Sequence, residues 1–144
     1  MTRFTRSALL EVPVGIAYEV VADVEKYPSF LPGCDAVVLL RDEGEIKDVE
    51  VRVSRAGMSE SFVTRNTHTA DRITMKLERG PLKRLVGSWY FKAIGEVGCR
   101  VEVDIDYQLE GLFAPMIAGL ADTIADKLVD AFTRRIQAVA DDRA

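Results

Sequence analysis

The chain has 144 residues, of which 48% are hydrophobic and 29% are charged, and its net charge at pH 7 is −4. This composition is typical of a soluble globular protein, and the length corresponds to a single domain, residues 1–144. The acidic balance argues against a protein that binds nucleic acid with its whole surface, but it is compatible with a local basic patch. No apolar run is long enough to span a membrane, and no signal peptide is recognisable.

The first quarter of the chain predicts a strand, a short helix and a proline-containing segment. Residues Arg3 to Val12 alternate between apolar and polar side chains, which is typical of a half-buried strand. Pro13 ends this strand, and Ile16 to Asp23 predict a short apolar helix. Val24 to Cys34 contain two prolines and several apolar side chains, so they predict short turns or a one-turn helix anchored to the core.

Six further strands are predicted in hairpin order, separated by turn-forming residues. Their ranges are Asp35–Arg41, Ile46–Arg55, Met58–Thr67, Ile73–Glu78, Leu85–Ile94 and Cys99–Glu110. Short connections of this kind favour antiparallel pairing. The last strand has one apolar and one charged face, which is typical of a sheet with one wet side. The third of these strands has mixed faces, so the orientation of Arg65 and His68 is left open.

The chain ends in a long amphipathic helix, from about Pro115 to Val139. Apolar residues recur at three- and four-residue steps, whereas Asp122, Asp126 and Asp130 fall on the other face and are expected to be solvated. A stripe of this length must be buried against an element of similar length. The order of elements therefore predicts an α+β fold, in which a curved seven-stranded antiparallel sheet wraps around the C-terminal helix, with two short helices after the first strand.

A curved sheet and one helix do not easily fill the space between them. Small residues at Gly87 and Gly119 either leave room for a ligand or allow the helix and the sheet to pack closely. The residues expected to line a tunnel are apolar, namely Val51, Met75, Leu77, Trp89, Phe91, Val103, Leu120 and Ile124. An apolar cavity with few polar groups suits a lipid-like ligand and does not suit hydrolysis.

Few residues suggest a catalytic or metal site. His68 is the only histidine, and a surface or capping role is favoured over that of a catalytic base. Cys34 and Cys99 are far apart in the sequence and are expected to be reduced core thiols rather than a disulfide or metal pair. We therefore predict no catalytic residues, no metal and no catalytic cofactor.

Two segments are candidates for contact with a ligand or a partner. Asp23 to Cys34 is predicted to form either a rim or gate of the tunnel or a packed corner. Arg79 to Leu85 interleaves basic and apolar residues in a predicted loop. Its side chains would contact anionic lipid headgroups or a partner through Arg79, Leu82, Lys83 and Arg84, although an ordinary solvated loop is equally compatible with the pattern.

The string D-V-E-K-Y-P-S-F-L-P-G-C, Asp23 to Cys34, resembles the signature of the coenzyme-Q-binding START-like proteins, within the polyketide cyclase/START superfamily. This family also includes a bacterial ribosome-association toxin. The similarity continues through Gly80-Pro81, Trp89–Phe91, Gly98-Cys99 and the helix residues Leu128 to Arg135, so it covers nearly the whole chain.

The resemblance implies the helix-grip fold, with a lipid-sized tunnel between the sheet and the long helix. It implies a carrier rather than an enzyme, which binds and delivers ubiquinone or a related isoprenoid quinone in support of respiration. It also implies that Trp89 and Phe91 line the tunnel and that its entrance is shaped by Tyr27, Pro28, Phe30, Leu31 and Pro32.

Two other functions are compatible with the resemblance. The first is a regulator that binds the large ribosomal subunit and blocks subunit joining, with Arg79 to Arg84 as a local basic contact. The second is an enzyme of the aromatase/cyclase type, which needs polar groups in the cavity, and the pattern suggests few. The expected partners are a quinone, a transient membrane surface and, for the regulator, the large ribosomal subunit, but not DNA. Mitochondrial members carry a targeting extension, whereas this chain starts at its first strand, so we expect a bacterial, cytoplasmic protein that is at most peripheral to the inner membrane.

Overall fold

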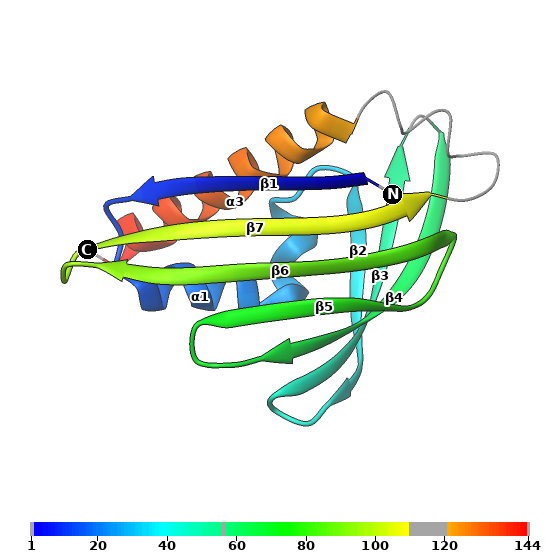
Figure 1. Ribbon diagram of the computed structural model, residues 1–144, viewed down its shortest axis with the longest axis horizontal. Helices are drawn as coiled ribbons and strands as arrows, with labels where there is room; N and C mark the ends of the chain where they lie inside the picture. Colours follow the sequence, from blue (N-terminus) through cyan, green and yellow to red (C-terminus); the bar gives the residue numbers. More distant parts are fainter. Residues whose placement is uncertain (1, 56, 110–120, 144) are drawn as a thin grey trace.

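The computed structural model describes residues 2–55, 57–109 and 121–143 (Figure 1). Within these ranges, one strand is followed by an α-helix and a 3-10 helix, and then by a run of strands and a long helix. The elements are β1 Thr2–Leu10, α1 Val14–Ala22, η1 Val24–Ser29, β2 Cys34–Asp42, β3 Ile46–Arg55, β4 Met58–His68, β5 Arg72–Arg79, β6 Leu82–Ile94, β7 Gly98–Leu109 and α3 Ala121–Asp142.

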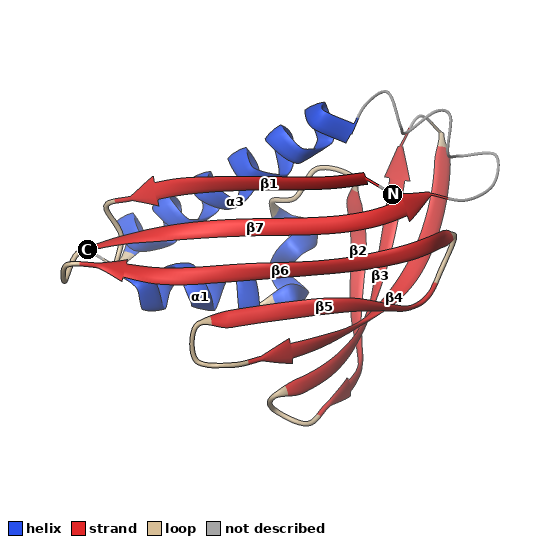
Figure 2. Ribbon diagram, viewed as in Figure 1, coloured by secondary structure: helices blue, strands red, loops and turns tan. Residues whose placement is uncertain are grey.

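The strands of the described ranges form one seven-stranded sheet in the order β1-β7-β6-β5-β4-β3-β2. Strands β2 to β7 each pair antiparallel with their neighbours in sequence, whereas β1 pairs antiparallel with β7, near the other end of the chain. The sheet is strongly curved, and α1 and α3 lie behind β1, β7 and β6 (Figures 1 and 2). The predicted α+β fold, a curved antiparallel sheet that holds a long C-terminal helix, is confirmed.

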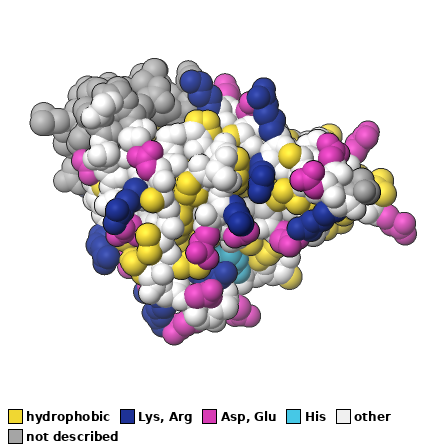
Figure 3. All heavy atoms as spheres, turned by 180° about the vertical axis from the view of Figure 1, so that it is seen from behind, with side chains coloured by type: hydrophobic (Ala, Val, Ile, Leu, Met, Phe, Trp, Pro, Cys, Tyr) yellow, Lys and Arg dark blue, Asp and Glu magenta, His cyan; other side chains and the backbone are white. Residues whose placement is uncertain are grey.

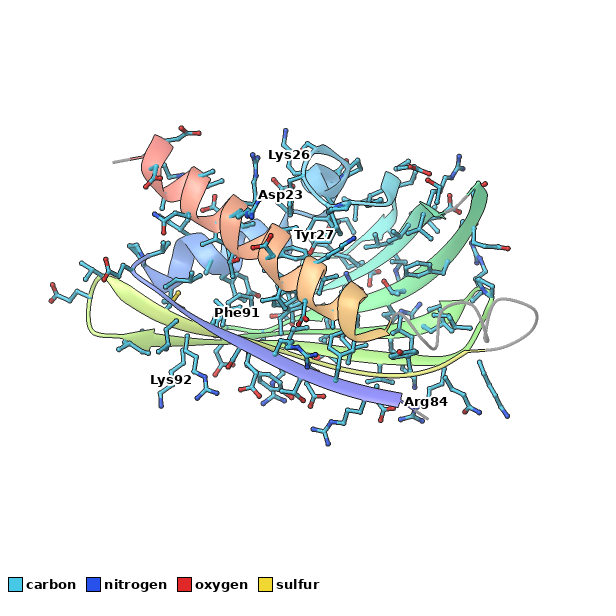
Figure 4. All side chains as sticks on the ribbon, turned by 90° about the horizontal axis from the view of Figure 1, so that it is seen from above. Asp23, Lys26, Tyr27, Arg84, Phe91 and Lys92 are labelled. Atoms are coloured by element: carbon cyan, nitrogen blue, oxygen red, sulfur yellow. The ribbon has the colours of Figure 1, made fainter. Side chains whose placement is uncertain are left out.

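The hydrophobic core lies between the concave face of the sheet and the two α-helices. Because strand side chains alternate, Val101 and Val103 of β7 both point inward and are buried. Phe132 and Ile136 of α3 close the core from the other side, and both are buried. Removal of this apolar surface from water, at ~25 cal/mol per Å2, is the main force that holds α3 on the sheet. The opposite face of the sheet is charged, and Lys92 of β6 extends from it (Figure 4).

Polar contacts fix the position of α1 between the sheet and α3. The Tyr18 hydroxyl donates a hydrogen bond to the carbonyl oxygen of Thr69, in the turn after β4. Glu19 binds Arg143, just beyond the end of α3, with an N–O distance of 2.7 Å. Both side chains of this ion pair are largely exposed, so it contributes less to stability than the apolar contacts of α1.

The predicted loop from Arg79 to Leu85 is wrong, because most of it is strand. Arg79 ends β5 and Leu82 begins β6, so only Gly80 and Pro81 lie between the two strands. Gly80 has φ +153°, a conformation that residues with a side chain rarely adopt. Pairing of Leu82 with Leu109 on β7 extends β6 by three residues beyond the predicted start. The cations of this hairpin, Arg79, Lys83 and Arg84, are exposed, and Leu82 is half-buried.

The described part of the C-terminal helix agrees with its predicted amphipathic pattern. Asp126 and Asp130 are exposed, as expected, and they bind Arg6 of β1 and Arg134 of α3, respectively. The helix continues to Asp142, three residues beyond the predicted end. Its predicted start at Pro115 lies outside the described residues, as do Glu110 and Gly119.

Candidate functional site

Three of the predicted tunnel residues lie in the closely packed core beneath the helices. Trp89, Phe91 and Val103 are 4%, 6% and 1% exposed. The ring of Trp89 lies 4.8 Å from that of Phe132, measured between centroids. The space left between this part of the sheet and α3 is about 10 Å3, close to the room that one water molecule needs. A quinone tail does not fit in this part of the interior.

Gly87 allows close packing rather than leaving a gap. A methyl group at this position would lie 3.0 Å from Cε of Met75 and 3.3 Å from Cγ1 of Ile105. Neighbouring side chains therefore already fill the space beside the glycine. Of the two functions predicted for small residues, packing is the one that Gly87 performs.

The remaining predicted tunnel residues lie on the strands beyond β6 or on the first part of the helix. Val51 of β3 and Met75 and Leu77 of β5 are half-buried on the concave side of the sheet. Leu120 lies outside the described residues, as does the side chain of Ile124. Tunnel lining by the predicted set stays a prediction, and β3 and β5 are where the sheet offers apolar side chains away from α3.

A row of polar side chains on β4 lies on this same concave face. Thr64 and Asn66 are each 3% exposed, and His68 follows them at the two-residue spacing of one strand face. Their cross-strand partners on β5 are inward-facing, namely Leu77, Met75 and Ile73. The Thr64 hydroxyl donates a hydrogen bond to Oδ1 of Asn66 at 2.8 Å. The interior therefore carries more polar groups than the sequence pattern indicated.

The environment of His68 differs from the favoured surface or capping role. The side chain is half-buried, and its Nε2 atom is buried without a hydrogen-bond partner among the described residues. Burial lowers the pKa of His68, and the positive charge of Lys47 lowers it further. The imidazole, cyan in Figure 3, is visible from the helix side of the molecule. Arg65 has the opposite orientation and binds Asp48 on the outer face at 2.9 Å.

The signature segment packs as a corner against α3. The Tyr27 hydroxyl donates a hydrogen bond to the carbonyl oxygen of Val21, and burial raises the pKa of this phenol. The rings of Tyr27 and Phe30 lie 5.1 Å and 5.3 Å from that of Phe132. Leu31 also packs against the core. Of the two structures predicted for Asp23 to Cys34, the packed corner describes these residues.

The outer side of the same segment forms one wall of an open groove of about 390 Å3. Phe30 and Pro32 form this wall, and α3 forms the other. The helix contributes side chains at three- and four-residue steps along one face, namely Lys127, Asp130, Ala131, Arg134, Arg135 and Ala138. The guanidinium carbon of Arg135 lies 5.6 Å from the centre of the Phe30 ring. The sequence pattern suggested the two walls separately, but nothing local to either segment predicted that they face each other.

The described residues hold no group of three or more His, Cys, Asp or Glu side chains that could bind a metal ion. Cys34 and Cys99 are buried free thiols, as predicted, and burial raises the pKa of both. Within the part of the chain that the structure describes, no helix is both long enough and apolar enough to cross a membrane.

Comparison with known proteins gives consistent similarities. The family described as polyketide cyclase / dehydrase and lipid transport matches residues 10–133. The ribosome association toxin RatA of Pseudomonas aeruginosa is 37% identical over 136 residues, which cover 93% of this chain and 94% of the relative. An 18 kDa protein of Caulobacter crescentus, whose solution structure is known, is 30% identical with a TM-score of 0.76, over 96% of this chain and 98% of that one. An aromatase/cyclase from Streptomyces shares the fold, with a TM-score of 0.84 at 16% identity, over 94% of this chain and 93% of that one.

Proposed function

Because this chain belongs to the polyketide cyclase / dehydrase and lipid transport family, and because of the relative it resembles within it, we propose that it is a non-enzymatic protein that associates with the ribosome. The observation that carries the proposal is the 37% identity to the ribosome association toxin RatA over nearly the full length of both chains. The finer proposal is that this protein binds the large subunit and so blocks subunit joining.

Co-sedimentation with ribosomes tests this function. Purified protein is mixed with dissociated subunits from the same bacterium, separated on a sucrose gradient and detected by immunoblot. We expect the protein in the large-subunit fraction, with fewer joined ribosomes after magnesium is raised. If the contact involves RNA phosphates, binding also weakens steeply as salt increases. Protein that stays at the top of the gradient at low salt, with subunit joining unchanged, contradicts the proposal.

Delivery of an isoprenoid quinone is a second candidate function. Two observations favour it: the family description includes lipid transport, and Val51, Met75 and Leu77 present apolar groups on the concave side. Uptake would be driven by burial of the apolar tail, offset by the entropy lost in ordering it. The partners of this function are ubiquinone, or a similar polyprenyl lipid, and a membrane surface that is contacted transiently.

Mass spectrometry of lipid extracted from protein purified from its own host tests the carrier. Stoichiometric ubiquinone supports this function, and a Leu77→Glu variant should then lose the lipid. Leu77 suits this test better than Trp89, because a charge in place of the buried Trp89 would be expected to unfold the protein. Protein that contains no lipid and takes up no added quinone excludes the carrier.

An aromatase/cyclase-type enzyme is the third candidate, and the polar row on β4 is the observation that favours it. Thr64, Asn66 and His68 could orient an oxygen-rich substrate, and His68 could exchange a proton with it. Turnover of a poly-β-ketone substrate that is lost in a folded His68→Gln variant would support this enzyme. Equal turnover in both proteins excludes a catalytic role for His68.

A further inference from the structure

We propose that the groove between the signature segment and α3 binds single-stranded ribosomal RNA, with phosphates held by Lys127 and Arg135. This inference rests on the proposed ribosome association and names the surface and the chemistry of the contact. The groove is open to solvent, has a volume of about 390 Å3, and is lined by both charged and apolar side chains.

The charge of the groove favours an anionic partner. Three cations line it, Lys127, Arg134 and Arg135, against one carboxylate, Asp130. Arg134 is paired with Asp130 at 3.1 Å, whereas no described carboxylate forms an ion pair with Lys127 or Arg135. Two positive charges therefore remain for a partner, on a protein whose net charge is −4. Such a local excess is the pattern expected of a protein that contacts nucleic acid with one patch.

The apolar part of the groove suits the flat face of a base. Ala131 and Ala138 keep its helix wall low, while Phe30 and Pro32 form the opposite wall. The Arg135 guanidinium already lies 5.6 Å from the Phe30 ring centre, so a planar cation and an aromatic ring occur side by side. Unpaired bases in RNA are bound by stacking on aromatic and guanidinium planes while cations hold the backbone.

The surroundings of the groove agree with this partner. Lys26 of η1 is exposed and extends to solvent on the side of α3 that faces away from the sheet (Figure 4). Lys and Arg side chains alternate with apolar atoms on the helix side of the molecule (Figure 3). The most exposed large apolar side chains, Leu9 and Val97, lie elsewhere, at the end of β1 and in the turn before β7, so the groove is not the apolar rim that insertion into a lipid surface needs.

A matched pair of double variants tests the inference. Lys127→Gln/Arg135→Gln removes the two available cations of the groove, and Lys76→Gln/Lys92→Gln removes two exposed cations of the outer sheet face with the same change in net charge. The probes are whole large subunits, protein-free large-subunit RNA and a single-stranded RNA oligonucleotide of mixed sequence. Circular dichroism and thermal unfolding first establish that both variants fold.

We expect the groove variant to bind each probe at least ~10-fold more weakly than the wild type. Its slope of log affinity against log salt should fall by about 2, one for each lost phosphate contact. The sheet variant should bind as the wild type does. A Lys127→Arg/Arg135→Lys variant keeps both charges and should retain most of the salt dependence, which shows that charge rather than misfolding causes the loss.

The outcomes separate the two proposals. Wild-type protein that does not co-sediment with ribosomes contradicts the proposed function itself. Wild-type protein that does co-sediment, with a groove variant that binds equally well, overturns the groove and leaves ribosome association in place. Loss of subunit binding in the groove variant, with no binding of wild-type protein to either RNA probe, assigns the groove to a ribosomal protein and overturns the RNA partner.

Discussion

Tyr27 and Phe132 meet edge to face, with ring centroids 5.1 Å apart and an interplanar angle of 87°. They lie on η1 and α3, so this contact ties the signature segment to the C-terminal helix. Phe30 and Trp89 pack against the same Phe132 ring, at 5.3 Å and 4.8 Å. One helix residue thus joins the signature segment, the sheet and the long helix, and the outer groove is built on this junction.

Phe132→Ala should be among the most destabilising single changes in the chain. Phe132 is 2% exposed and contacts three aromatic rings, so truncation leaves a cavity that its neighbours cannot refill. We expect the free energy of unfolding to fall by about 3–5 kcal/mol, as measured by urea denaturation. Phe132→Leu keeps most of the volume and should lose much less. A loss below about 1 kcal/mol for the alanine variant would show that the junction is loosely packed.

Tyr27→Phe should separate the hydrogen bond of the signature segment from its packing. The ring and its contact with Phe132 are kept, but the Val21 carbonyl loses its donor. We expect a decrease of about 1 kcal/mol in the free energy of unfolding, which a urea titration can measure. Tyr18→Phe is a matched control, because its hydroxyl bonds to an exposed carbonyl, that of Thr69, and should contribute less. Equal losses in the two variants would argue against a special role for the corner.

Gly80→Ala and Gly15→Ala should have opposite effects on stability. At Gly80, φ is +153° and a methyl group would lie 2.5 Å from Cβ of Phe62, so strain of about 1–3 kcal/mol and a clash are both expected. At Gly15, inside α1, a methyl group would meet nothing within 4 Å, and alanine should stabilise the helix by up to about 1 kcal/mol. Thermal unfolding of the two variants checks the signs. A neutral Gly80→Ala variant would show that the β5–β6 turn can adopt another conformation.

His68 should titrate below its ordinary pKa of 6.5, because burial and Lys47 both disfavour the imidazolium. It is the only histidine, so its ring signals in proton NMR report this pKa without ambiguity. Lys47→Gln should raise the pKa, since it removes one of the two causes. A pKa at or above 6.5 in the wild type would contradict the buried, unpartnered environment.

The same shift makes stability depend on pH. Since the unfolded chain binds the proton of His68 more tightly than the folded chain does, the contribution of His68 to stability is present above about pH 6.5 and is lost as the pH falls through the lower, folded-state pKa. His68→Gln should therefore flatten the fall in unfolding free energy between about pH 7 and pH 5. Urea titrations at several pH values check this, and an unchanged slope would mean that other groups dominate.

The sequence by itself determined the order of the elements and the class of the fold. Strand alternation, hairpin turns and the helical stripe are local patterns, set by which side chains leave water, and each appears in the structure within a few residues of its predicted range. The element bounds failed where pairing rather than pattern decides them. Leu82 to Arg84 joined β6 because β7 offered them partners, which no local pattern records.

Only the tertiary structure decided which face of β4 is buried and what the helix meets. Both faces of β4 carry polar residues, so the sequence pattern was ambiguous, and Thr64 and Asn66 are inside because their neighbours on β3 and β5 fix the register. The groove likewise brings Phe30 opposite Lys127 and Arg135, about a hundred residues later in the chain. Local propensity carries no information about contacts across such a distance. They arise when the sheet curves and α3 docks on it, since burial of Phe132 against Tyr27, Phe30 and Trp89 then fixes both walls.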